Sequence, residues 1–304
     1  MPQSVRFKNR TWEVAANLFF PESFDEKKKY ASIVCVHPGS SVKEQTAGLY
    51  AAKLASQGGF ITLVFDASYQ GESGGEPRYL EDPATRIEDI RCAVDYLTRQ
   101  PFVDSSRIGL LGVCAGGGYA ANAAMTERRI KAVSTVVATN ASRAFRESNP
   151  LETLEAVGLQ RTAEANGAEE LITNWTPSSV EEARQSGMDE FDMLEAIDYY
   201  RTPRGEYPTS CNKLRFNSMS ALIMFDAFHL AEFFLTQPLL VIFGDRVGAF
   251  GSYRDGFELY NKAASKTKKM HIVKGASHYD LYDQPEATGE ALNQLIPFFR
   301  EHLA

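Results

Sequence analysis

The order of buried strands and amphipathic helices constrains the fold of this chain more than any other feature. Short apolar, β-branched runs such as "YASIVCVH", "FITLVFD" and "RIGLLGV" alternate with segments of helical spacing, of which residues 84–99 are the clearest. The runs "IKAVSTVVA", "QPLLVIFGD" and "KKMHIVKG" continue the series, and the opening "SVRFKNRTWEVAANLFFP" predicts a β-hairpin. Strands that alternate with helices form a parallel sheet with helices on both faces. We therefore expect an α/β fold with a mostly parallel central sheet.

One long segment interrupts this alternation. Residues 141–234 are mostly helical in pattern and contain no good buried strand. A length of 304 residues suits one large domain with an inserted subdomain. The interruption predicts a helical cap at residues 141–234, inserted into a core that comprises residues 1–140 and 235–304.

Composition and charge exclude several classes of function. The net charge is −7 and the acidic residues are spread along the chain, so no basic surface for nucleic acid is expected. The N-terminal residues lack an apolar signal-peptide region, and no apolar run reaches about 18 residues, so neither secretion nor a membrane span is predicted. The four cysteines lie far apart without a C-x-x-C pair, which disfavours zinc and dithiol redox sites. We expect a cytoplasmic protein that uses no metal and no cofactor.

A single cysteine stands where a predicted strand meets a predicted helix. In "LLGVCAGGGYA", Cys114 has Gly112 and Gly116 two residues to either side. This G-x-C-x-G spacing matches the nucleophile elbow, in which small neighbours permit a sharp strand-to-helix turn that lifts the nucleophile into a cleft. The helix N-terminus would lower the pKa of the thiol. Alternatively, Cys114 is a small buried residue and the glycines only permit close packing, but the preceding strand and following helix favour the nucleophile.

A thiol nucleophile requires a base and a carboxylate that orients the base. The best candidate base is His278 in "VKGASHYDLYD", because it follows the last predicted strand and the carboxyl ends of parallel strands meet at one edge of the sheet. The candidate acid is Asp245, one residue past a glycine at the end of the preceding strand, and Asp280 and Asp283 are alternatives. We therefore predict a triad of Cys114, His278 and Asp245.

Two loops supply the remaining candidate residues. An oxyanion hole needs two N–H donors. One would be Ala115, directly after the nucleophile, and the other would come from "HPGSS" at Gly39 or Ser40, although a plain turn is the alternative for that loop. The loop at residues 66–78 offers Tyr69 and Arg78 as substrate contacts.

With these motifs in place, the chain resembles the α/β-hydrolase superfamily over roughly residues 1–140 and 235–304. It looks closest to the dienelactone-hydrolase-like branch, which carries cysteine in its elbow. The motifs "HPGSSVKEQTAGLYA", "DASYQGESGG", "GVCAGGGYA" and "GASHYDLYD" are also similar to fungal polyketide transferases and thiohydrolases and to bacterial hydrolases that resemble Xaa-Pro peptidases. The resemblance implies an α/β-hydrolase fold with Cys114 as nucleophile, His278 as base and Ala115 as an oxyanion donor.

Two positions depart from the family pattern. The superfamily acid usually lies two or three residues past the glycine, whereas Asp245 lies one residue past it. True dienelactone hydrolases also carry a glutamate beside the first loop, where this chain has His37 and only a more distant Glu44. Dienelactone itself is therefore not expected to be the substrate.

The sequence thus predicts an enzyme that transfers an acyl group from a small ester-like molecule to its cysteine. A thiolate is itself a good leaving group, so it favours activated esters, thioesters and strained lactones over amides. The alternatives are an acyltransferase with the same nucleophile, a non-catalytic ligand-binding protein, and a redox sensor at Cys114, which has no resolving cysteine near it in sequence. A homodimer is compatible with the sequence.

Overall fold

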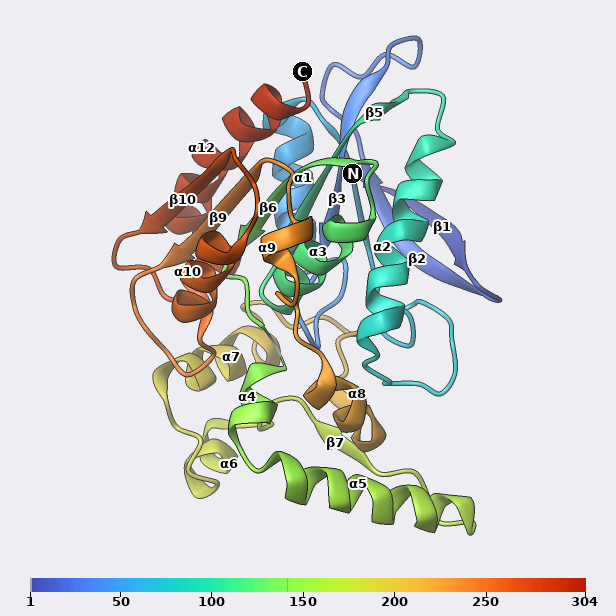
Figure 1. Cartoon of the computed structure of the whole chain (residues 1–304), viewed down its shortest axis with the longest axis vertical. Helices are drawn as coiled ribbons and strands as arrows, with labels where there is room; N and C mark the ends of the chain where they lie inside the picture. The colour runs from blue at the N-terminus through green and yellow to red at the C-terminus, as the bar shows by residue number, and fades with distance from the viewer. Residues whose placement is uncertain (1, 141) are drawn as a thin grey trace.

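A mixed, mostly parallel sheet forms the centre of the computed structural model, which describes residues 2–140 and 142–304 (Figure 1). Its strand order is β1-β2-β4-β3-β5-β6-β9-β10. These strands are β1 (Gln3–Asn9), β2 (Trp12–Phe19), β3 (Tyr30–Val36), β4 (Ile61–Phe65), β5 (Val103–Val113), β6 (Ile130–Val136), β9 (Leu239–Gly244) and β10 (Lys268–Val273).

Strand direction divides the sheet into two parts. The six strands from β4 to β10 pair in parallel, while β2 is antiparallel to both β1 and β4. The N-terminal hairpin was therefore predicted correctly, and so was the mostly parallel sheet. Because parallel strands connected through helices are covered on both faces, β4 and β9 are buried along their whole length.

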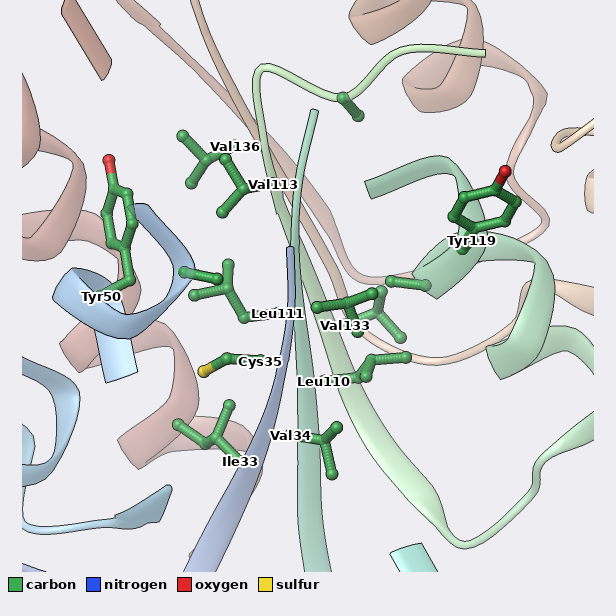
Figure 2. Packing of buried hydrophobic residues seen from close by; sticks show 14 of the residues in the cluster. Ile33, Val34, Cys35, Tyr50, Leu110, Leu111, Val113, Tyr119, Val133 and Val136 are labelled. Atoms are coloured by element: carbon green, nitrogen blue, oxygen red, sulfur yellow. The ribbon is translucent and has the colours of Figure 1, made fainter. Parts of the chain in front are cut away.

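Helices cover both faces of the sheet. On one face α1 packs against α12, and on the other α2 packs against α3. Figure 2 shows the consequence for the core, since Tyr50 of α1 and Tyr119 of α3 lie on opposite sides of the buried strands. The core helices are α1 (Thr46–Gly58), α2 (Pro83–Thr98), α3 (Ala115–Thr126), α10 (Ser252–Lys262), α11 (Asp280–Asp283) and α12 (Pro285–His302).

Most of the chain between β6 and β9, which we call the insert, lies beyond one end of the sheet (Figure 1). It has a small hydrophobic cluster of its own, which includes Val157, Leu214 and Leu222. Its last helix, α9, packs against α3 and α10 of the core. The elements are α4 (Arg143–Glu147), α5 (Pro150–Ala165), β7 (Ile172–Asn174), α6 (Val180–Gln185), α7 (Phe191–Arg201), β8 (Lys213–Arg215), a 3-10 turn (Phe216–Ser218), α8 (Met219–Met224) and α9 (Ala231–Phe234).

The insert also contains a feature that the sequence pattern did not predict. Strands β7 and β8 pair antiparallel, with Thr173 opposite Leu214. Each strand has only three residues, which is too short to show an alternation of apolar and polar side chains. Within residues 2–140 and 142–304, none of the helices combines the length and the apolar composition that crossing a membrane requires.

Candidate active site

Cys114 occupies a strained backbone position between β5 and α3. Its φ is 55° and its ψ is −124°, a conformation that residues other than glycine rarely adopt. The turn is tight enough to require glycine on both sides. A Cβ at Gly112 would lie 2.2 Å from the carbonyl oxygen of Gly116, and a Cβ at Gly116 would lie 2.4 Å from that of Val36. The glycine spacing that suggested the elbow therefore has a steric cause.

Cys114 as a whole residue is partly exposed, and its thiol lies among polar groups. The hydroxyl of Thr139 is 3.9 Å from its sulfur. Burial raises the pKa of the Cys114 thiol, and the nearby Tyr282 hydroxyl and Ala115 N–H lower it by less. From the sequence a lowered pKa is predicted at the helix N-terminus, but desolvation outweighs these donors.

His278 follows β10 and lies beside the same tyrosine. Its Nε2 is 3.4 Å from the Tyr282 hydroxyl, so that this hydroxyl has contacts with both the imidazole and the Cys114 thiol. The ring packs against Phe250, with centroids 5.5 Å apart. His278 is only 4% exposed, and burial lowers its pKa to about 3. Its Nδ1 has no hydrogen-bond partner in the part of the chain that the structure describes.

The structure does not join Asp245 to His278 by a hydrogen bond. Asp245 is exposed, and its Oδ1 accepts a 2.6 Å hydrogen bond from the backbone N–H of Gly275. It therefore stabilises the loop that leads from β10 to His278. Asp245 lies one residue past the glycine instead of two or three, and this unusual spacing is consistent with its bond to Gly275 in place of His278.

The two alternative acids also have other partners. Asp280 accepts a 2.8 Å hydrogen bond from the N–H of Ser277. Asp283 accepts two hydrogen bonds from Arg204 of the insert, at 2.9 and 2.7 Å. Both carboxylates organise the segment around His278 and leave its Nδ1 unpaired.

The predicted oxyanion residues lie at the thiol and beneath the insert. The backbone N–H of Ala115 is near enough to the Cys114 sulfur to lower the pKa of the thiol. Ser40 has a φ of 60°, and its carbonyl accepts a 2.8 Å hydrogen bond from the Ser210 hydroxyl of the insert. Trp175 of the insert covers Gly39, where an added Cβ would be 3.3 Å from the indole ring. The insert thus covers the first loop directly.

Tyr69 and Arg78 make contacts within their own part of the fold. The ring of Tyr69 is buried and packs against Trp12, with centroids 5.3 Å apart. Arg78 donates to the carbonyls of Gly71, at 2.8 Å, and Ser73. These contacts stabilise the loop, and a role in contacting substrate stays a prediction for both residues.

His37 follows the end of β3, and its ring nitrogens contact backbone atoms. Its Nδ1 lies 2.6 Å from the carbonyl oxygen of Pro38, and its Nε2 accepts a 3.0 Å hydrogen bond from the N–H of Ala67. Burial and the neighbouring Arg86 hold the pKa of His37 well below its usual value. With both ring nitrogens engaged, His37 is a structural residue.

Sequence reasoning missed two tyrosines. Tyr282 lies four residues after His278, a spacing that places both on one side of a helical turn and was available as a signal. Tyr200 comes from α7 of the insert, and its buried hydroxyl has no hydrogen-bond partner among the described residues. Burial raises the pKa of Tyr200, and the nearby Cys114 adds to this effect. No local pattern predicted the position of Tyr200.

Comparison with known proteins places the chain in a family. YcjY of Escherichia coli K12, an uncharacterised protein, is 45% identical over 303 residues, which are 97% of this chain and 96% of YcjY. The chain belongs to the family of YcjY. The crystal structure of the hypothetical protein PA2218 of Pseudomonas aeruginosa is 30% identical with a TM-score of 0.84, and covers 99% of this chain and 94% of PA2218. Close sequence and structural relatives thus span the core and the insert together.

Two further matches concern the fold and the hydrolase family. The crystal structure of the α/β hydrolase GrgF of Penicillium sp. sh18 has a TM-score of 0.82 at 19% identity, covering 100% of this chain and 99% of GrgF. The predicted α/β-hydrolase fold is therefore confirmed. Residues 87–189 match the family model described as "BAAT / Acyl-CoA thioester hydrolase C terminal", a range that includes Cys114.

The expected similarity to fungal thiohydrolases is confirmed over one third of the chain. Thiohydrolase aneE of Aspergillus aculeatus is 37% identical over 105 residues, which are 34% of this chain and 33% of aneE. Together with the matched family model, this supports the assignment of the chain to the hydrolases. Membership of the dienelactone-hydrolase-like branch stays a prediction.

Proposed function

We propose that this protein hydrolyses an activated ester, thioester or lactone through an acyl-enzyme intermediate on Cys114. The observation that carries the proposal is the strained turn at Cys114, which presents the thiol beside the Ala115 N–H and the Tyr282 hydroxyl. His278 lies on the other side of that hydroxyl. The matched thioester-hydrolase model and the thiohydrolase relative support the same class of reaction.

The first step forms a bond from sulfur to the substrate carbonyl carbon. At rest both partners are neutral, because burial raises the pKa of the Cys114 thiol and lowers that of His278. A proton therefore has to leave the sulfur as the bond forms. His278 accepts it as general base, with the Tyr282 hydroxyl as the bridging group that accepts the thiol proton and donates its own to Nε2. The Ala115 N–H and an N–H of the Ser40 loop stabilise the oxyanion.

The second half of the reaction releases the acyl group. The carbon–leaving-group bond breaks, and the imidazolium of His278 returns its proton to the leaving group. Water then attacks the thioester with His278 as base. The bond from the acyl carbon to the Cys114 sulfur breaks, and the imidazolium returns the proton to the thiolate. Because a thiolate leaves readily from the tetrahedral intermediate, poor leaving groups such as amines would be retained and sulfur expelled. The favoured substrates are therefore thioesters, aryl or enol esters and strained lactones.

An acyltransferase is the second candidate, and the enclosure of the site favours it. His278 is 4% exposed, and Trp175 of the insert covers Gly39 of the first loop. An enclosed acyl-enzyme is shielded from water, so an alcohol, thiol or amine that fits beneath the insert would compete for the acyl group. Product analysis with added acceptors separates transfer from hydrolysis.

Intact-mass spectrometry after brief exposure to p-nitrophenyl esters and acyl thioesters tests the proposal. We expect a mass increase of one acyl group on the wild-type protein and a burst of released leaving group. Cys114→Ala abolishes both. His278→Ala and Tyr282→Phe slow acylation by about 100-fold or more, as expected when a general base or its bridge is removed.

The control is Cys211→Ala, because Cys211 is an exposed cysteine in the insert. It should retain the adduct and the burst in full. An adduct that persists in Cys114→Ala, or a full rate of turnover in that variant, would exclude Cys114 as the nucleophile. Faster turnover of an unactivated amide than of a thioester would contradict the proposed substrate class.

A further inference from the structure

We propose that Asp192, in helix α7 of the insert, is the carboxylate that positions His278 and stabilises its imidazolium. This inference rests on the proposed function, since it requires His278 to act as base. Asp192 is a positioning residue that acts through His278. It would be the acid of the triad, the role predicted from the sequence for Asp245.

Asp192 inserts its carboxylate into the loop where the acid was expected. The loop at residues 245–251 follows β9, and the backbone N–H of Phe250 donates a 2.7 Å hydrogen bond to Oδ2 of Asp192. The fit is close, because a Cβ at Gly248 would lie 2.2 Å from the same oxygen. Asp192 is 1% exposed. The loop after β9 therefore does hold a buried carboxylate, although the insert supplies it.

Two buried polar atoms near this loop lack partners. Oδ1 of Asp192 and Nδ1 of His278 both make no hydrogen bond to any residue in the described ranges. A polar atom that is buried without a hydrogen-bond partner is destabilising, so such atoms call for an explanation. An acceptor oxygen and a ring nitrogen that can carry a proton are complementary to each other.

Phe250 connects the two side chains. Its backbone N–H binds Asp192, and its ring packs against His278 with centroids 5.5 Å apart. The charge of Asp192 also reaches the residue next to His278: burial raises the pKa of Tyr279, and Asp192 raises it further. Asp192 thus lies close enough to act electrostatically on this segment. Asp192 lies in the first turn of α7, and its Oδ1 is unpaired among the described residues.

The chemistry assigns a defined role to the pair. A proton on Nδ1 of His278, available to Oδ1 of Asp192, leaves Nε2 as the acceptor that faces Tyr282. When His278 takes up the thiol proton at Nε2, the ring becomes positive and the carboxylate stabilises it without becoming protonated. The two atoms are not hydrogen-bonded to each other in this structure, and we expect the bond to close as the imidazolium forms.

Alkylation of Cys114 by iodoacetamide tests this without any ester substrate. The rate of adduct formation is followed by intact mass for wild type, Asp192→Asn, His278→Ala and the double variant. At about pH 7 the neutral thiol passes its proton to His278 as the carbon–sulfur bond forms, so Asp192→Asn should slow alkylation about tenfold or more. At about pH 10 hydroxide removes the proton, and the two rates should agree. The double variant should be no slower than His278→Ala alone.

Three further variants make the result specific. Asp192→Glu keeps the charge and should give an intermediate rate at neutral pH, which also serves if Asp192→Asn does not fold. Asp189→Asn is the matched control, because it lies three residues away and is exposed, and its rates should equal wild type at both pH values. Asp245→Asn tests the competing assignment and should have a smaller effect than Asp192→Asn.

Several outcomes would overturn the proposal. They are a neutral-pH rate for Asp192→Asn equal to wild type, an equal loss at both pH values, or a loss confined to neutral pH in Asp245→Asn alone. Its failure is distinguishable from failure of the proposed function. If no ester or thioester acylates Cys114 but the loss in Asp192→Asn at neutral pH persists, the role of Asp192 stands while the proposed reaction does not.

Discussion

At the scale of single residues, burial sets the protonation of Cys114 and His278, the proposed reacting pair. It raises the pKa of the Cys114 thiol and lowers the pKa of His278 to about 3, and both changes favour the uncharged forms. A thiolate–imidazolium pair at rest would need the opposite shifts. The helix N-terminus, the Tyr282 hydroxyl and the Ala115 N–H therefore stabilise the sulfur mainly when negative charge develops on it during the reaction.

The pH dependence of thiol alkylation follows from these directions. The free thiolate reacts fastest, and its raised pKa confines it to alkaline pH, whereas at neutral pH the thiol reacts by passing its proton to His278. We therefore expect the rate of iodoacetamide modification of the wild-type protein to change little between about pH 5 and pH 8 and to climb above about pH 9. Cys211, which is exposed, provides an internal comparison by peptide mapping. A steady climb from about pH 6 without a plateau would show that His278 accepts no proton from Cys114 at neutral pH.

At the scale of elements, the turn from β5 to α3 depends on glycines that admit no side chain. Gly112→Ala forces a Cβ to within 2.2 Å of the carbonyl oxygen of Gly116, where only backbone movement relieves the clash. We expect the free energy of unfolding to fall by about 3 kcal/mol or more, because overpacking against rigid backbone is costly. Urea denaturation followed by circular dichroism measures this change.

The control for this substitution is Gly289→Ala in α12. An added Cβ at Gly289 meets nothing within 4 Å, and alanine favours helix over glycine by about 1 kcal/mol. Its stability should equal or exceed that of wild type. Equal stabilities of Gly112→Ala and wild type would show that the turn relaxes more freely than its contacts indicate.

The elements also show which parts of the site were predictable. Cys114 and His278 each follow a strand with a strong apolar pattern, so the sheet alone brought their positions together. Tyr200 and Asp192 come from α7, whose position depends on how the insert packs and not on any local pattern. The prediction of Asp245 relied on the loop after β9 supplying its own carboxylate. That loop instead receives the carboxylate of Asp192.

At the scale of the whole molecule, the insert is joined to the segment that carries His278. Arg204, just past α7, donates hydrogen bonds to both carboxylate oxygens of Asp283 and, at 3.0 Å, to the carbonyl of Tyr279. Both side chains of this ion pair are mostly buried, at 18% and 20% exposure. The pair therefore fixes α11 to the insert more firmly than a surface ion pair would.

Breaking this ion pair should loosen the site without unfolding the core. We expect Arg204→Ala to speed amide hydrogen exchange at residues 279–283 about tenfold while the core strands exchange at wild-type rates. Arg254→Ala is the matched control, since its ion pair with Glu147 also links core to insert but is about half exposed, and it should change little. Unchanged exchange at residues 279–283 in Arg204→Ala would show that the segment is held by its aromatic packing instead.

The position of the insert between β6 and β9 has a consequence for the order of synthesis. The ribosome makes Cys114 with the first part of the sheet, then the whole insert, and only afterwards the strands that precede His278. At translation rates of about 5–20 residues per second, His278 is synthesised roughly 10–30 s after Cys114. During that interval β6 lacks its partner β9, and the edge of a growing parallel sheet is open. The nascent chain is therefore most exposed to mispairing while the insert is being translated, and the proposed active site is completed only when β10 joins the sheet.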